Sequence, residues 1–241
     1  KAEKFIRFFL GAEEFINNKK RYCLWLVDAN PMELTTMPEV MKRIEAVRKM
    51  RSESKREATN KLADYSHLFG EIRQPKEGEY LLIPRVSSEN RRYVPMAFLD
   101  GNTIVSDAVQ IVPEATLYEF GILTSNVHMA WMRAVCGRLK SDYRYSKDIV
   151  YNNFPWCNPT DAQRQKIEQT AQAILDARSK YPESSLADLY GETMYLFSDL
   201  LEAHRANDRA VMQAYGFPVN MTESECVAEL FKMYERLTGK K

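Results

Sequence analysis

The sequence predicts an α+β fold in which a mixed strand-and-helix region is followed by a small all-α bundle. Two observations predict this fold. Short β-branched and aromatic runs alternate with helical patterns in the first part of the chain, and only helical patterns follow Pro155. The strands and helices come at irregular spacing, which argues against a repeating βαβ unit. We therefore expect two domains, residues 1–156 and residues 157–241.

The first domain combines strand patterns with one long helical pattern. Four runs bounded by turn residues have the composition of strands: residues 21–29, 80–87, 91–99 and 103–112. Residues 37–65 predict a helix. The apolar stripe of this helix consists of Val40, Ile44, Val47 and Met50. Residues 114–137 predict two short helices, of which the second begins after Ser125 and ends at Gly137.

The second domain shows three helical patterns with clear start and stop signals. Thr160 caps a helix over residues 161–179. Its inward residues are Ile167, Ala171, Ile174 and Leu175. A second helix over residues 198–215 ends at Gly216 and Pro218, and a third begins with the capping box of Thr222 and Glu225 and ends at Gly239. These signals predict a small helical bundle.

The composition is that of an ordinary globular protein, with 45% hydrophobic and 28% charged residues and a net charge of +1. No run approaches the roughly 18 consecutive apolar residues of a membrane span, and the first residues lack the apolar core of a signal peptide. We therefore expect a cytoplasmic location and no membrane partner, and we interpret the chain as part of a longer one. The four cysteines form no Cys-x-x-Cys pair, which favours free thiols over disulfides or a zinc site.

Patterns that would carry catalysis are weak. Asn30-Pro31-Met32-Glu33 begins like the Asn-Pro-Pro-aromatic motif of amino-group methyltransferases, but it lacks the second proline and the aromatic residue. The three histidines lack metal-ligand spacing, and His128 lies eight positions from Cys136, too far for a catalytic pair on one helix. We therefore predict no catalytic or metal-binding residue in this chain.

Clusters of cations give a stronger signal. Residues 42–56 contain seven lysines and arginines against two glutamates. Cations in such a cluster are suited to contact DNA phosphates. The candidate phosphate contacts here are Arg48, Arg51, Lys55 and Arg56. A solvated helix face is the alternative interpretation.

A second cationic cluster is "GRLKSDYRYSKDIVYNNFPW", residues 137–156, where cations alternate with aromatic residues. Its candidate phosphate contacts are Arg138, Arg144 and Lys147. The alternative is a charged surface loop that buried tyrosines anchor. Phe154-Pro155-Trp156 excludes regular structure and suits the junction between the two domains.

This segment, with "LYEFGILTSNVHMAWMRAVC" before it, closely resembles the end of the target recognition domain of MmeI-like restriction-modification enzymes. The similarity continues, in the same order, through four further motifs at residues 10–26, 43–63, 83–99 and 201–217. Cys157 departs from the pattern, because the family usually has proline there. The family joins a nuclease, an adenine-specific DNA methyltransferase, a target recognition domain and a helical C-terminal region in one chain.

The resemblance implies that this chain reads double-stranded DNA around an adenine to be methylated. It implies no cofactor in this chain, with S-adenosylmethionine bound in the methyltransferase region upstream. In the family, paired positions discriminate single base pairs, and they match Arg85 with Asp107 and Lys140 with Asp142. A cation can satisfy guanine O6 and N7 while a carboxylate accepts the cytosine amino group, so each pair suits a G·C base pair. If the target adenine lies between the two recognised base pairs, the motif should contain 5′-GAG-3′ with its adenine methylated. The alternative is that both pairs are surface ion pairs that read nothing.

Two other functions remain open at this stage. A protein-interaction module, comparable to the specificity subunits of type I systems, would use the helical tail to dock a partner. A stand-alone hydrolase would use a histidine-cysteine or carboxylate pair. Salt-dependent duplex binding separates the first from DNA recognition. Activity that survives mutation of every histidine, or no activity at all, counts against a histidine-dependent hydrolase.

Overall fold

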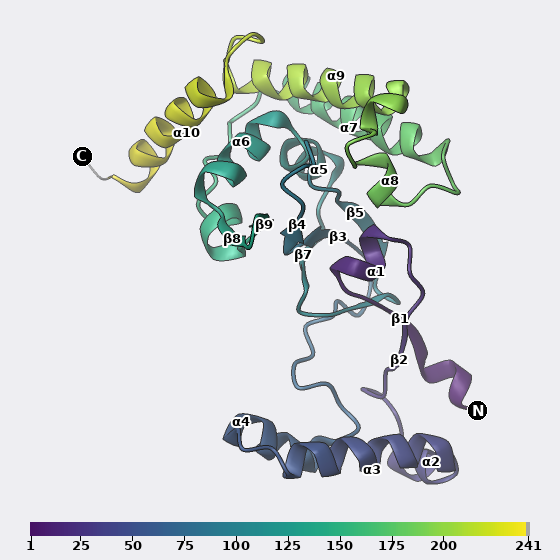
Figure 1. The fold of residues 1–241 in the computed structure, drawn as a ribbon. Coiled ribbons are helices and arrows are strands. Elements are labelled where there is room, and N and C mark those ends of the chain that lie inside the picture. The colour runs from purple at the N-terminus through teal and green to yellow at the C-terminus, as the bar shows by residue number, and fades with distance from the viewer. Residues whose placement is uncertain (240–241) are drawn as a thin grey trace.

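The chain forms an elongated molecule with helices at both ends and small sheets between them (Figure 1). The structure, a computed structural model, describes residues 1–239. One end consists of α2 (Pro31–Thr35), α3 (Pro38–Ser52) and α4 (Glu57–Asn60). The opposite end consists of α7 (Asp161–Ser179), α8 (Leu186–Leu189), α9 (Ser198–Tyr215) and α10 (Glu223–Thr238). The expected α+β class is confirmed, because the strands lie in the first part of the chain and helices fill the rest.

The described strands form three sheets of three strands each. In the first sheet, β1 (Ile6–Leu10) lies between antiparallel β2 (Tyr22–Leu24) and parallel β6 (Ile104–Val105). In the second, β3 (Glu79–Pro84) lies between β5 (Ala97–Asp100) and β7 (Val109–Pro113), both antiparallel to it. In the third, β9 (Asp142–Arg144) lies between β4 (Val86–Ser87) and β8 (Gly137–Leu139), again antiparallel.

Strand β3 is the centre of the first part of the chain, residues 1–156, because both of its faces are covered. Successive side chains of a strand point to opposite faces. Leu81 and Ile83 therefore pack into the main core, which includes residues of α5 (Leu117–Leu123) and α6 (Asn126–Val135). Tyr80 and Leu82 pack on the other face against α1 (Ala12–Ile16). All four side chains are at most 1% exposed.

The main core continues from the sheets into the helical tail without a break. It joins Phe120 and Trp131 of the first part to Ile167 and Leu200 of the second. Helices α5 and α7 approach each other so closely that a Cβ atom on Gly121 would lie 2.6 Å from Ile167 Cγ2. The predicted boundary between residues 156 and 157 therefore passes through one shared hydrophobic core.

Buried polar contacts add to this shared core. The Tyr93 hydroxyl donates to Asp208 Oδ2 at 2.7 Å, and the Asn126 amide donates to Asp208 Oδ1 at 2.8 Å. Asn207 Nδ2 donates to the Gly121 carbonyl at 2.7 Å. Buried carboxylates need such donors, because an unpaired charge is costly in a core. These bonds hold α9 against the first part of the chain.

The helices with clear caps lie where the sequence predicts them. Helices α5 and α6 occupy the interval 114–137, and the Ser125 side chain accepts from the His128 amide as an N-cap. Helices α7 and α9 have the predicted bounds, and the capping box of Thr222 and Glu225 begins α10. Gly216 and Gly239 both adopt a positive φ, the conformation that ends a helix.

The strands and the long helix differ from the prediction. The helix expected over residues 37–65 is broken into α3, α4 and the 3₁₀ helix η2 (Lys61–Tyr65), and Met50 is exposed rather than inward. The strand patterns at 21–29 and 91–99 contain only the short strands β2 and β5. The hairpin β8–β9 was not predicted. The remaining short elements are η1 (Ala2–Phe5), the π-helix η3 (Lys147–Tyr151) and η4 (Met194–Leu196).

Candidate nucleic-acid interface

The hairpin β8–β9 presents the cationic and aromatic segment in an ordered way. Tyr143 and Tyr145 point inward and are 8% and 2% exposed, which anchors β9. The intervening Arg144 is exposed, because side chains alternate along a strand. Buried tyrosines anchor this segment, and its cations are exposed. The structure therefore fits both the charged surface loop and the phosphate-contacting segment that the sequence left open.

Lys140 lies in the tight turn of this hairpin. Leu139 pairs with Asp142, so Lys140 and Ser141 form a two-residue turn. Lys140 has a φ of 56°, a backbone conformation that costs roughly 1 kcal/mol for a residue with a side chain. The turn exposes Lys140 and leaves Asp142 half-buried two residues later. Strained backbone conformations of this kind cluster at functional sites, which supports a functional role for Lys140.

Arg138 supports the turn from the neighbouring strand. Its guanidinium lies 4.0 Å from the centre of the Tyr143 ring and donates to the Ser141 carbonyl at 2.7 Å. It also lies 3.8 Å from the Glu89 carboxylate. These contacts leave Arg138 about half exposed, so its predicted phosphate contact stays a prediction. Arg144 and Lys147, the other two cations of the segment, are exposed.

The second candidate pair, Arg85 with Asp107, is in direct contact. Arg85 donates from its guanidinium to the Asp107 carbonyl at 2.7 Å and from its amide to the Ala108 carbonyl at 3.1 Å. The contact therefore involves the backbone of Asp107 rather than its carboxylate. Asp107 is exposed, and its side chain forms no hydrogen bond or ion pair with any of the described residues 1–239.

Backbone hydrogen bonds join the two candidate pairs into one unit. The Arg85 carbonyl accepts from the Tyr145 amide at 2.8 Å, and Val86 of β4 pairs with Arg144 of β9. A groove of about 860 Å³ beside this unit is lined by Arg85, Asp107 and Lys147, among others. The structure thus brings together all four predicted base-reading residues on connected strands and turns.

Arg91 is a charged neighbour of the hairpin that the sequence pattern did not reveal, since residues 91–99 resemble a strand. Its Nε atom is buried and has no hydrogen-bond partner among residues 1–239. Burial lowers the pKa of Arg91, and the negative charge of Asp142 acts in the opposite direction. Asp142 therefore lies close enough to this half-buried arginine to act on its charge.

The basic helix α3 lies at the other end of the molecule from the helical tail (Figure 1). Arg51 donates to the carbonyls of Leu62, Tyr65 and Leu68 at 2.9 to 3.0 Å. This geometry favours a structural role for Arg51, which closes the loop after α3, over the predicted phosphate contact. Arg48 forms an exposed ion pair with Glu45 at 3.4 Å.

Lys55 and Arg56, which follow α3, are exposed and have no ion-pair partner within the described part of the chain. Arg48, Lys55 and Arg56 therefore remain available to an external anion. Their contact with phosphate stays a prediction.

Two of the three histidines are core residues. His128 Nε2 lies 2.9 Å from the Tyr145 hydroxyl, and burial lowers the pKa of His128 to about 3. His204 Nε2 lies 2.7 Å from the Tyr190 hydroxyl, and burial also lowers its pKa. Both side chains are fully buried, so they cannot contact a substrate. Within residues 1–239, no three acidic, histidine or cysteine side chains gather as metal ligands, and no helix is long and apolar enough to span a membrane.

Comparison with known proteins identifies the family. The sequence model described as "MmeI, target recognition domain" matches residues 1–158, and that described as "MmeI, C-terminal domain" matches residues 159–240. The chain belongs to the MmeI family. The resemblance predicted from the sequence motifs is thereby confirmed.

Two relatives of the MmeI-family chain extend this result. "DNA methyltransferase A" of Bacillus subtilis (strain 168) is 36% identical over 235 residues, covering 97% of this chain and 26% of the relative. The solved type IIL restriction-modification enzyme MmeI, in complex with DNA, is 46% identical with a TM-score of 0.95. That match covers 99% of this chain and 32% of the MmeI chain. The chain thus spans about a quarter to a third of these longer proteins.

Proposed function

We propose that this chain is the sequence-reading module of a restriction-modification DNA adenine methyltransferase. The observation that carries the proposal is the match of nearly the whole chain, at a TM-score of 0.95, to an enzyme solved in complex with DNA. The hydrogen-bonded unit around the two candidate pairs supports the proposal, since each pair contains a cation and a carboxylate, the two side-chain types that suit a G·C base pair. The partner is double-stranded DNA.

Base reading requires groups that enter the major groove in a fixed register. Guanine offers two acceptors there, which a lysine or arginine satisfies, and cytosine offers an amino donor that a carboxylate accepts. Lys140 and Asp142 lie at and just after the tip of a hairpin, which is narrow enough to enter this groove. We assign one G·C base pair to Lys140 and Asp142, and a second to Arg85 and Asp107.

Methyl transfer belongs to another region of the full-length enzyme. The described residues place no glycine-rich loop between a strand and a helix, and their two buried histidines cannot reach a substrate. We therefore propose that S-adenosylmethionine binds in a methyltransferase region that precedes this chain, and that this region flips the target adenine out of the duplex. We also propose that the full-length enzyme contains a nuclease region.

The basic helix gives a direct test of DNA contact. Replacing Arg48, Lys55 and Arg56 by alanine in the full-length enzyme should weaken binding to all duplexes alike, because phosphate contacts carry no sequence information. Three lost contacts should flatten the slope of log affinity against log salt by about 2.7. Fluorescence anisotropy with duplexes of different sequence, over a series of salt concentrations, measures both effects.

A matched variant controls for the loss of three positive charges. Lys166, Lys232 and Arg236 are exposed cations of α7 and α10, in the helical tail, and their replacement by alanine should leave the salt slope unchanged. Equal slopes for both triple variants and the parent would show that Arg48, Lys55 and Arg56 do not contact phosphates. A selective loss for one DNA sequence would instead assign base reading to these residues.

A further inference from the structure

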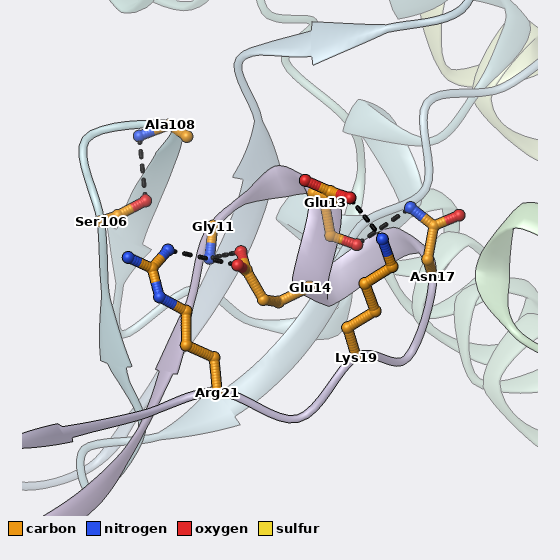
Figure 2. A network of polar contacts seen from close by, with 8 residues as sticks. All are labelled: Gly11, Glu13, Glu14, Asn17, Lys19, Arg21, Ser106 and Ala108. Carbon is orange, nitrogen blue, oxygen red and sulfur yellow. Dashed lines mark hydrogen bonds and ion pairs between the residues drawn. The ribbon is translucent and has the colours of Figure 1, made fainter.

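The turn from Ser106 to Ala108, which carries Asp107, lies beside a small polar network around Gly11 and Glu14 (Figure 2). The Ser106 amide donates to the Leu10 carbonyl at 2.9 Å, which continues the pairing of β6 with β1. The Ser106 hydroxyl accepts from the Ala108 amide at 3.2 Å, so Ser106 closes the turn over Asp107. The orientation of Asp107 therefore depends on where Ser106 lies.

Glu14 is the central group of this network. Its carboxylate accepts from the Gly11 amide at 2.8 Å and from the Arg21 guanidinium at 3.2 Å (Figure 2). Burial would raise the pKa of Glu14, but the hydrogen bonds of the two backbone amides and of Arg21 outweigh burial and hold the pKa below its ordinary value. Arg21 in turn lies 4.9 Å from the centre of the Phe9 ring. Glu14 is thus ionised, and hydrogen bonds from two backbone amides and from Arg21 hold its carboxylate in place.

Gly11 links this carboxylate to the turn through its peptide bond with Leu10. The carbonyl of this peptide group accepts from the Ser106 amide, and its amide donates to Glu14. A Cβ atom at Gly11 would lie 2.8 Å from Glu14 Oε2 and 3.0 Å from Ser106 Oγ, so there is no room for a side chain at this position. A shift of the Glu14 carboxylate therefore moves the peptide group that holds Ser106. Arg85 restrains the opposite side of the same turn through the Asp107 carbonyl.

We infer that Glu14 is a positioning residue for base recognition by Asp107, acting through Gly11 and Ser106. The inference rests on the proposed function, because it concerns the accuracy with which the Asp107 carboxylate meets a base. The strength of a hydrogen bond to a base changes with differences of tenths of an ångström in its length, and with its angle. A more mobile turn at Asp107 should therefore lower discrimination at the base pair assigned to Arg85 and Asp107. The other contacts with DNA should remain unchanged.

The test uses the full-length enzyme with Glu14→Ala, with Glu14→Gln, and with Glu13→Ala as the matched control. Glu13 lies next to Glu14 on α1 but pairs with the exposed Lys19. Methylation rates are measured on duplexes altered at the base pair assigned to Arg85 and Asp107, and on duplexes altered at that assigned to Lys140 and Asp142. Each preparation yields both discrimination ratios, so partial loss of folded enzyme cancels from their comparison.

Glu14→Ala should lower discrimination about tenfold at the first base pair and leave the second unchanged. Glu14→Gln should retain discrimination, because glutamine still accepts from the amide of Gly11. Glu13→Ala should behave as the parent. Equal losses at both base pairs, or no loss at either, would overturn the inference. Arg21→Ala, which removes an exposed partner of Glu14, gives a milder form of the same selective loss if Glu14→Ala does not fold.

Asp107→Ala separates the inference from the proposed function. If Asp107→Ala relaxes one base pair and Glu14→Ala does not, only the positioning role of Glu14 falls. If Asp107→Ala changes no base preference, the assignment of Asp107 as a reader is wrong, and the inference falls with it.

Discussion

Exchanging Lys140 for glutamate and Asp142 for arginine in the full-length enzyme is expected to replace a guanine of the methylated motif by cytosine. The exchange reverses the donor and acceptor that the hairpin presents to the same base pair. Each matched contact contributes about 1–3 kcal/mol of discrimination, which corresponds to roughly fivefold to 150-fold in preference. Glutamate at position 140 meets the same φ of 56° as lysine does, so the exchange adds no new backbone strain. Sequencing that detects methylated adenine in the host genome measures the motif.

A charge exchange outside the hairpin serves as the control. Glu202 and Arg205 form an exposed ion pair on α9, in the helical tail. Exchanging these two charges should leave the motif unchanged, because neither residue is assigned to a base. If the exchange at Lys140 and Asp142 abolishes methylation everywhere, or leaves the motif unchanged, this pair does not read a base.

Ending the chain after Trp156 is expected to prevent folding of the recognition region. Residues 1–156 and the helical tail share one hydrophobic core, to which Phe120, Trp131, Ile167 and Leu200 belong. A large apolar side chain contributes about 1.5–3 kcal/mol when buried. Losing several such contacts removes as much free energy as the roughly 5–15 kcal/mol that keeps a domain folded.

Circular dichroism and thermal unfolding test this expectation. The truncated chain should show no cooperative transition, whereas residues 1–241 should unfold cooperatively. Asp208→Ala probes the same interface without a deletion. It leaves the Tyr93 hydroxyl and the Asn126 amide unpaired in the core, at about 1–3 kcal/mol for each group. A truncated chain that unfolds cooperatively would show that the recognition region is an independent domain.

The helices that begin or end at a capping residue could be predicted from the sequence. The caps at Ser125, Thr160 and Thr222 and the glycine at position 216 identified the helices, because capping chemistry depends on residues within one turn. The hairpin β8–β9 was missed because its turn is Lys140-Ser141, without the Asn-Gly or Asp-Gly signal of such turns. The break of the long helix after Ser52 accompanies the contacts of Arg51 with a loop more than ten residues away, which no local pattern records.

The candidate site was only partly accessible to sequence reasoning. Cation clusters indicated a nucleic-acid partner, and the resemblance to the MmeI family supplied the two candidate pairs for base reading. The role of Glu14 could not be read from the sequence, because it depends on the parallel pairing of β1 with β6, which are about a hundred residues apart. Arg91 was likewise hidden in a strand-like run, and its proximity to Asp142 arises only when β4 pairs with β9.

The most direct test of base reading is the methylated motif of the full-length enzyme. The enzyme is expressed in a host that lacks adenine methylation, and the genome is sequenced by a method that detects methylated adenine. The assignment of G·C pairs to Arg85 with Asp107 and to Lys140 with Asp142 predicts one motif, which contains 5′-GAG-3′ with its adenine methylated. A motif without guanine on both sides of the methylated adenine, or methylation without any sequence preference, would contradict it.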